Sequence, residues 1–156
     1  MDNNIQAIED QDMSANTVQY IVVKIGNEQY GIDIKYIDNI VRNQAITRVP
    51  KTQPYYKGVI NLRGEIVPVL SIRVKLGLPD DEFTDKTRII IVKIEGAMIG
   101  VIVDQVREVV TLSVDDTEEV TKTANDDSAA AYLSGIGKNG NELISLLNIE
   151  SVVIEG

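Results

Sequence analysis

An internal repeat is the feature that most limits the folds open to this 156-residue chain. Residues 22–41 align without a gap with residues 91–110, and residues 58–72 align with residues 135–149. Both blocks keep their order, and their identical pairs include Val23/Val92, Lys24/Lys93, Gly31/Gly100, Val41/Val110, Gly58/Gly135, Glu65/Glu142 and Leu70/Leu147. Strands rich in Ile and Val often align loosely, but two ungapped blocks in the same order are improbable by chance. The repeat predicts two copies of a unit of about five strands, a size that closes into a barrel.

The block at residues 58–72, GVINLRGEIVPVLSI, has the pattern of a β-hairpin. Gly64 at its tip supplies the positive φ that a tight turn needs, and we expect a type I turn closed by a glycine bulge. The returning strand is apolar on both faces, with Ile66, Pro68 and Leu70 on one and Val67 and Val69 on the other. Such a strand packs on both sides, so we expect both sets of side chains to be largely buried. Because Pro68 lacks an N–H, its position predicts a sheet edge or a bulge.

Further strand patterns lie around this block. Residues 18–25 and 29–34 flank a Gly-Asn turn, which is typical of a hairpin. Residues 34–41 also fit helical spacing, but their β-branched side chains favour a bent strand. Residues 52–57 suit a short helical turn, and residues 70–76 suit a short helix.

Composition excludes several kinds of chemistry. The chain has no cysteine, and therefore no disulfide, thiolate nucleophile or sulfur-ligated metal. It has no histidine, the usual general base near neutral pH and the commonest transition-metal ligand. No stretch approaches the roughly 18 apolar residues of a membrane span, and the N-terminus lacks a basic start followed by an apolar run. We therefore expect a cytoplasmic protein of one domain, without direct insertion into a membrane.

The formal net charge of −9 is concentrated in two segments. Residues 1–16 carry four acids and no base and have no sustained periodicity, so we expect a disordered acidic tail. Residues 111–132 carry six acids against one base and are interpreted as an acidic connecting segment. The remaining body has equal numbers of acids (24 − 10 = 14) and bases (15 − 1 = 14), without clustered Lys and Arg. We therefore expect no nucleic-acid partner.

One pattern is similar to a cofactor site, because residues 135–140, GIGKNG, match GxGxxG. A dinucleotide site needs that loop between a strand and a helix, so that backbone N–H groups meet the pyrophosphate. Here the following residues, ELISLLNI, are of strand type, and Ile60 replaces Gly137 in the other copy. We interpret the glycines as turn residues and expect no cofactor. The acidic pairs lack the spacing of a calcium loop and are interpreted as solvated acid, so we expect no metal site and no catalytic residues. The pairs are Asp80-Asp81, Asp115-Asp116 and Asp126-Asp127.

Longer motifs resemble those of a known family. EQYGIDI, RVPKTQPYYKGVINLRGEIVPVLSI, GVIVDQVREVV, and YLSGIG followed by ELISLLNIE are similar to the chemotaxis coupling proteins of the CheW family, from Val18 to Val153. The resemblance implies a mainly β fold of two SH3-like five-stranded β-barrels with short helices, related by a pseudo-two-fold axis and sharing a third core. Residues 17–156 would form this domain from approximate repeats 17–80 and 86–156. Whether the barrels exchange strands stays open.

The resemblance also implies a function. A protein of this family is a non-enzymatic scaffold that joins the cytoplasmic tips of methyl-accepting chemoreceptors to the histidine kinase CheA. The contact on the kinase side is its regulatory domain, which resembles the same double barrel. Such a scaffold is cytoplasmic and is recruited to receptor arrays at the membrane. The alternative is a stand-alone module that binds only a kinase or another double-barrel partner.

The family motifs also imply receptor-binding residues. Arg63 occupies the position of the arginine in the family's NLRG tip and is the first candidate, with a solvated turn charge as the ordinary alternative. The apolar family positions near the groove between the barrels are Ile37, Ile66, Val106 and Val109. Core residues that bind nothing would show the same apolar pattern. Asn39 is a further receptor-binding candidate; it stands where many relatives have a glutamate near the arginine, which puts an ion pair with Arg63 in doubt.

Overall fold

The structure is a computed structural model of the chain, and it describes residues 16–42, 44–119 and 129–154. Two segments predicted from the sequence lie wholly or partly outside the described residues. They are the tail predicted at 1–16, of which only residue 16 is described, and the acidic segment at 111–132, of which residues 120–128 are not described. None of the helices in the described part is long and apolar enough to cross a membrane.

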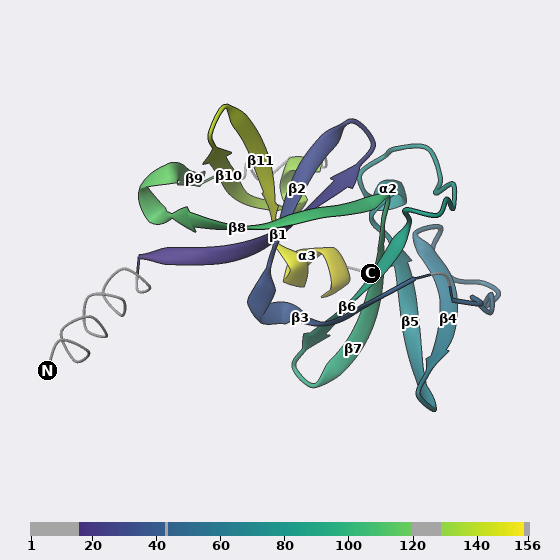
Figure 1. The fold of residues 1–156 in the computed structure, drawn as a ribbon. Coiled ribbons are helices and arrows are strands. Elements are labelled where there is room, and N and C mark those ends of the chain that lie inside the picture. The colour runs from purple at the N-terminus through teal and green to yellow at the C-terminus, as the bar shows by residue number, and fades with distance from the viewer. Residues whose placement is uncertain (1–15, 43, 120–128, 155–156) are drawn as a thin grey trace, which may run out of the picture.

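The described residues form mainly strands, with short helical turns between them (Figure 1). The strands are β1 (Thr17–Ile25), β2 (Glu28–Asp33), β3 (Ile37–Val41), β4 (Tyr56–Leu62), β5 (Glu65–Ser71), β6 (Arg88–Ile94), β7 (Ala97–Val103), β8 (Gln105–Ser113), β9 (Thr117–Glu119), β10 (Leu133–Asn139) and β11 (Glu142–Leu147). The α-helices are α2 (Ile72–Lys75) and α3 (Ile149–Ile154), and the 3₁₀ turns are η1 (Ile34–Tyr36), η2 (Val114–Asp116) and η3 (Ala129–Tyr132).

The strands form two sheets, and each sheet takes strands from both copies of the repeat. The six-stranded sheet, here sheet A, has the order β8-β1-β2-β11-β10-β9, and the five-stranded sheet, here sheet B, has the order β3-β6-β7-β5-β4. Each sheet thus combines the first two strands of one copy with the later strands of the other, through the parallel pairs β2–β11 and β5–β7. The barrels therefore exchange strands, and Figure 1 shows sheet A on the left and sheet B on the right.

Both sheets close into barrels in the same way: the chain that follows one edge strand pairs with the strand at the opposite edge. In sheet A, η2 turns the end of β8 into β9, which pairs with β10 at the opposite edge. In sheet B, Thr47 lies beyond β3 and bridges to Val59 of β4. A Cβ at Gly58 would lie 2.2 Å from the Thr47 carbonyl oxygen, and one at Gly135 would lie 2.5 Å from the carbonyl oxygen of Glu118. Both copies therefore have glycine where the closing backbone passes, because a side chain there would block closure.

Three cores fill the molecule. The interior of barrel A is packed with Val22, Val110, Leu112, Ile144 and Leu146. The interior of barrel B is packed with Ile60, Val67, Val69, Ile89, Ile91 and Ile102. The largest core, here the third core, lies between the barrels and takes residues from both sheets and both α-helices. The shared core that the family resemblance implies is thus present.

The third core is built from equivalent residues of the two copies. The equivalent pairs within it are Ile21/Ile90, Val23/Val92, Ile25/Ile94, Ile32/Val101 and Ile72/Ile149. Complete burial of one such side chain stabilises the fold by about 1.5–3 kcal/mol. Because the pairs come from both sheets, this burial holds the barrels together in an arrangement with pseudo-two-fold symmetry.

The GxGxxG pattern lies in a hairpin, where it covers the end of β10 and the turn to β11. Gly140 is the turn residue, with φ of 63°. Gly137 lies inside β10, where an added Cβ would come within 2.5 Å of the Leu112 side chain. Leu112 thus fills in barrel A the space that Ile60, the equivalent of Gly137, fills in barrel B. The interpretation of these glycines as turn residues is therefore correct for Gly140 and wrong for Gly135 and Gly137, which lie inside β10 and make room for Glu118 and Leu112.

Several local predictions are refined or corrected. Residues 34–41 begin as the turn η1 before they extend as β3, and the helix predicted at 70–76 is the single turn α2, capped by Ser71. Residues 52–57 form no helix, but the Tyr56 N–H donates to the Gln53 carbonyl oxygen at 2.9 Å and closes a single turn before β4. Residues 111–119 of the acidic segment do more than connect, since they finish β8 and close barrel A through η2 and β9.

Candidate functional site between the barrels

A bulge in β3 divides its side chains between two cores. Ile37 pairs with Val92, and Asn39 pairs with the next residue along β6, Ile91, so Asp38 is an extra residue without a partner. Val92 belongs to the third core, and Ile91 belongs to the interior of barrel B. Because directly opposed residues lie on the same face of a sheet, Ile37 faces the third core and Asn39 faces the barrel.

β8 carries the equivalent bulge, 69 residues further along the chain. Val106 pairs with Val23 and Val109 pairs with Ile21, and Arg107 is the extra residue. Val23 and Ile21 both belong to the third core, so Val106 and Val109 lie on the face of β8 that borders this core. Val106 is half-buried, whereas Val109 is 52% exposed.

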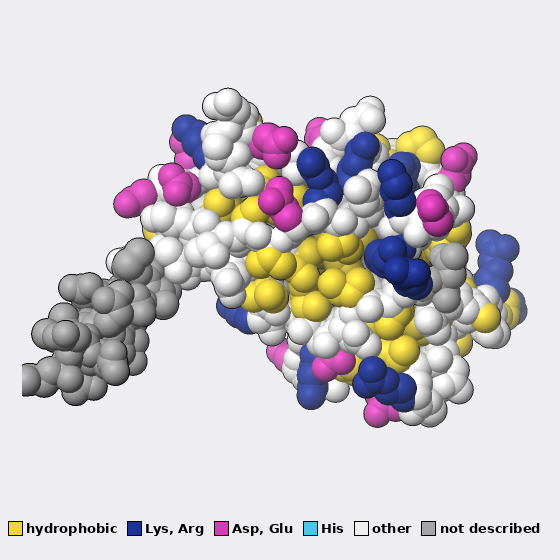
Figure 2. All heavy atoms as spheres, in the orientation of Figure 1, with side chains coloured by type: hydrophobic (Ala, Val, Ile, Leu, Met, Phe, Trp, Pro, Cys, Tyr) yellow, Lys and Arg dark blue, Asp and Glu magenta, His cyan; other side chains and the backbone are white. Residues whose placement is uncertain are grey.

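Ile40 completes a set of four apolar residues at the rim of the third core. It pairs with Ile90, a member of that core, and it is the repeat equivalent of Val109. We call this set the inter-barrel patch, and its members are Ile37, Ile40, Val106 and Val109. Figure 2 shows apolar side chains gathered at the centre of one face, in the area where Figure 1 shows β3, α3 and β8. Ile40 is not among the residues predicted from the sequence, although its alignment with Val109 was a signal that could have identified it.

Asn39 does not belong to the inter-barrel patch. Its side-chain Oδ1 accepts a hydrogen bond from the backbone N–H of Ile40 at 2.8 Å, on the other face of β3. The amide carries no charge, and no ion pair to Arg63 occurs within the described part of the chain.

The tip that carries Arg63 is a two-residue turn. Leu62 pairs with Glu65, and Arg63 and Gly64 between them have φ of 54° and 85°. Two successive residues with positive φ are typical of a type I′ turn, whose twist matches that of the flanking strands. The prediction of a type I turn with a glycine bulge is therefore wrong. The Gly64 N–H donates to Oδ1 of Asn61 at 2.9 Å, and the Arg63 side chain is exposed.

Ile66 is 65% exposed, so the expectation that both faces of β5 are buried is wrong at this position. The reason is that β5 pairs with β7 only from Val69 onward, so its first half extends beyond the neighbouring strand. This free edge is where Pro68 lies, as its missing N–H predicts. Figure 1 shows the β4–β5 tip at the lower end of sheet B, away from β8. The structure therefore places Ile37, Val106 and Val109 on strand faces that border the third core, and it places Arg63 and Ile66 at or next to the β4–β5 tip.

A charged contact fastens the two barrels to each other. Asp104, between β7 and β8, accepts hydrogen bonds from Arg73 Nε at 3.0 Å and Arg73 Nη2 at 2.8 Å, and from the Gly26 N–H at 2.8 Å. Arg73 belongs to α2, which follows sheet B, and Gly26 belongs to the β1–β2 turn of sheet A. Burial raises the pKa of Asp104, but these donors outweigh it and hold the pKa below its usual value. This contact, which we call the Asp104 clamp, joins α2, the β1–β2 turn and the link between β7 and β8.

The pair Asp80-Asp81 is not simply solvated acid. Ser71 Oγ donates to Asp81 Oδ2 at 2.5 Å, and Lys57 Nζ lies 2.7 Å from Asp80 Oδ1. Burial raises the pKa of the Asp81 carboxyl, although the Ser71 hydroxyl opposes this shift. These contacts tie the connection between the two copies to β4 through Lys57 and to the start of α2 through Ser71. No cluster of acidic residues that could hold a metal ion occurs among the residues whose structure is described.

Comparison with known proteins identifies the family. Residues 19–155 match the CheW-like domain. The chain is 35% identical over 133 residues to the chemotaxis protein CheW of Bacillus subtilis, which covers 85% of each protein. It is 34% identical over 143 residues to the chemotaxis protein CheW of Helicobacter pylori, which covers 92% of this chain and 86% of the relative.

A solved structure agrees. The crystal structure of the scaffolding protein TtCheW from Thermoanaerobacter tengcongensis superposes with a TM-score of 0.76 at 31% identity, over 84% of this chain and 88% of that one. The fold class expected from the resemblance, two SH3-like barrels, is confirmed, with β9 as an additional short strand in sheet A. The chain therefore belongs to the CheW family of chemotaxis scaffold proteins, which are adaptors and not enzymes.

Proposed function

We propose that this protein joins the cytoplasmic tips of methyl-accepting chemoreceptors to the regulatory domain of the histidine kinase CheA. It acts in the cytoplasm, at receptor arrays beneath the membrane. The observation that carries this proposal is the inter-barrel patch, where a half-exposed valine and three partly buried apolar residues lie at the surface between two rigid barrels. Exposed apolar patches on otherwise polar surfaces mark interaction sites.

The receptor contact uses the inter-barrel patch. A receptor tip is helical, and an amphipathic helix binds by placing its apolar stripe on an apolar surface of a partner. Arg63 and Ile66 at the β4–β5 tip provide a second contact point. The guanidinium of Arg63 is exposed and makes no ion pair with any described residue, so it is available to an acidic group of the receptor.

The kinase contact uses a different surface, at the end of a barrel. The β10–β11 hairpin offers one, because Leu143 is 62% exposed and Ile136 is 37% exposed. A partner built as the same double barrel can meet this end with one of its own, and such a heterologous contact propagates into a ring or a chain. The contact is mainly apolar, so its affinity falls only modestly between low and physiological salt.

Competition between the two partners tests the proposal. A receptor-tip fragment is titrated into a preformed complex of this protein with the kinase regulatory domain, and sedimentation reports the species formed. A ternary complex is expected. Clean displacement of the kinase domain would mean one shared surface and would refute the adaptor. Binding of the kinase domain without any binding of receptor would favour the stand-alone module instead.

Two matched variants separate the surfaces. Val109→Glu and Leu143→Glu each place a charge at an exposed apolar position, so both should keep the fold. Val109→Glu should lose receptor binding and keep kinase binding, and Leu143→Glu should do the reverse.

Arg63→Asp should weaken receptor association by about 2 kcal/mol while leaving thermal unfolding nearly unchanged. An equal loss of stability and of binding would make Arg63 a structural residue.

A further inference from the structure

The inter-barrel patch by itself cannot distinguish the two directions of a bound helix. Ile37 is the equivalent of Val106, and Ile40 is the equivalent of Val109. Ile37, Ile40 and Val106 pack against the third core, and Val109 pairs with Ile21 of that core. The pseudo-two-fold axis that exchanges these pairs also reverses a helix that lies across them. Apolar contact is not directional, so both directions bury similar surface and have similar free energy. The direction must therefore be set by a residue that differs between the two copies.

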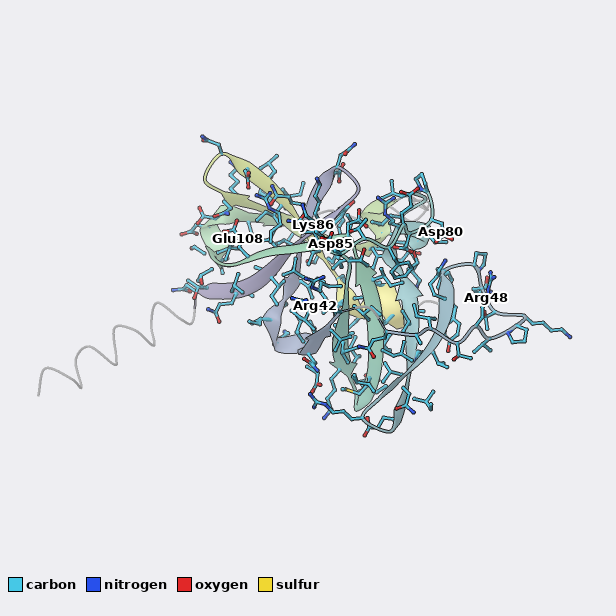
Figure 3. The ribbon with its side chains drawn as sticks, turned by 45° about the vertical axis from the view of Figure 1, so that its right-hand side comes forward. Arg42, Arg48, Asp80, Asp85, Lys86 and Glu108 are labelled. Atoms are coloured by element: carbon cyan, nitrogen blue, oxygen red, sulfur yellow. The ribbon has the colours of Figure 1, made fainter. Side chains whose placement is uncertain are left out.

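Arg42 is such a residue. It directly follows Val41, the last residue of β3, so it lies just beyond Ile40 at the end of the strand that carries this half of the patch. Its equivalent beyond Val109 is Thr111, which carries no charge. Arg42 is exposed, and it makes no ion pair with the residues that the structure describes. Figure 3 shows Arg42 near the middle of the molecule, between the strands of the two sheets.

No acid on the patch-facing side of β8 offsets this charge. Glu108 pairs with Val22, whose side chain packs inside barrel A, so Glu108 belongs to the other face of the strand. Figure 3 shows Glu108 to the left of Arg42, on the side of sheet A. At these two equivalent positions, residue 42 is therefore a cation and residue 111 is neutral.

We propose that Arg42 sets the direction in which a receptor helix lies on the inter-barrel patch, by binding an acidic side chain of that helix. The proposal rests on the proposed function, since it assumes that a receptor helix occupies the patch. A guanidinium suits this role because it binds a carboxylate through two parallel hydrogen bonds, which fix the position as well as the charge. The C-terminal end of a helix is also the end that favours a cation.

The effect on affinity is modest, because the pair is exposed. An exposed ion pair changes Kd by about two- to fivefold, and the same factor separates the two directions of the helix. Moving the cation to the equivalent position should therefore reverse the preferred direction with little change in affinity. The variant Arg42→Thr combined with Thr111→Arg makes this exchange, and both positions are exposed, so the fold should be kept.

The absence of cysteine allows a direct measurement of direction. A single spin label is placed at one of the two bulges, through Asp38→Cys or Arg107→Cys, which are equivalent and exposed positions. A receptor-tip fragment carries a second label at one end of its helix. The two labelled proteins should give different distances to the fragment. In the exchanged variant, the distance from residue 38 to the fragment should equal the distance from residue 107 in the unexchanged protein. The distance from residue 107 should likewise equal the one from residue 38 in the unexchanged protein.

The outcomes separate this inference from the proposed function. Interchanged distances, with a preference that weakens at high salt, would support the role of Arg42. Tight binding with the same distances in both proteins would refute it and leave the adaptor function intact. Failure of the unexchanged protein to bind the fragment would refute the proposed function itself, and this inference with it.

Discussion

The Asp104 clamp gives a prediction whose size can be worked from the structure. Asp104→Asn keeps the shape of the side chain and removes its charge. In the parent protein, the Asp104 carboxylate accepts three hydrogen bonds, two from Arg73 and one from the Gly26 N–H. A hydrogen bond to a charged group contributes about 1.5–3 kcal/mol when water is excluded. The two side chains are 19% and 27% exposed, so screening reduces this value.

The expected loss for Asp104→Asn is about 1–2 kcal/mol of unfolding free energy at pH 7. In a domain of this size, 1 kcal/mol corresponds to roughly 2–4 °C, so the unfolding midpoint should fall by about 2–8 °C. A double-mutant cycle with Arg73→Gln isolates the pair, and urea unfolding measures each free energy. A coupling energy below about 0.3 kcal/mol would refute the idea that this contact fastens the barrels.

The difference in unfolding free energy between the parent protein and Asp104→Asn should depend on pH, which gives an independent check. The pKa of Asp104 is lower in the folded protein than its usual value of 3.8. A lowered pKa stabilises the fold above the unfolded-state pKa, and this stabilisation is lost as pH falls through the folded-state pKa. The difference between the parent protein and Asp104→Asn should therefore be constant from about pH 5 upward and shrink below about pH 4. A difference that stays constant through this acid range would contradict the assigned cause.

Three further predictions concern packing and chemistry. Val67→Ala should cost about 2 kcal/mol or more in unfolding free energy, whereas Ile66→Ala should cost less than about 1 kcal/mol, because only Val67 is buried. Comparable losses of the two variants in urea unfolding would contradict the exposed placement of Ile66. Gly58→Ala should destabilise far more than Gly64→Ala, because only at Gly58 does the new Cβ meet a carbonyl oxygen, and equal melting temperatures would argue against barrel closure at Thr47. Calorimetry with ATP and with NAD should show no saturable heat, and micromolar binding of either would overturn the non-enzymatic assignment.

The barrels themselves could be predicted from the sequence, but the exchange of strands between them could not. The repeat, the glycine turns and the doubly apolar strand all follow from spacing and side-chain type. The hairpins β1–β2 and β6–β7 are equivalent, however, and either one presents the same apolar alternation to β3, β4 and β5. Alternation fixes which face of a strand is buried and does not choose between equal partners.

The candidate site was predictable only in part, for two local reasons. Bulges at Asp38 and Arg107 shift the alternation by one residue, and nothing in the residue types marks them. The bulge at Asp38 places Ile37 and Ile40 on one face of β3 and Asn39 on the other, which simple alternation does not predict. The exposure of Ile66 depends on where the neighbouring strand begins to pair, which is a long-range property of the sheet.

The exchange of strands has a consequence for how the chain is made. All strands of sheet B lie between residues 37 and 103, so this barrel can close while the rest of the chain is still being synthesised. The hairpin β1–β2 emerges first, yet its partners β8 and β11 come after all the strands of sheet B, and Tyr30 pairs with Ser145 near the far end. Such distant pairings are slow to form. The Ile and Val side chains of the β1–β2 hairpin therefore stay exposed to solvent until β8 and β11 have left the ribosome.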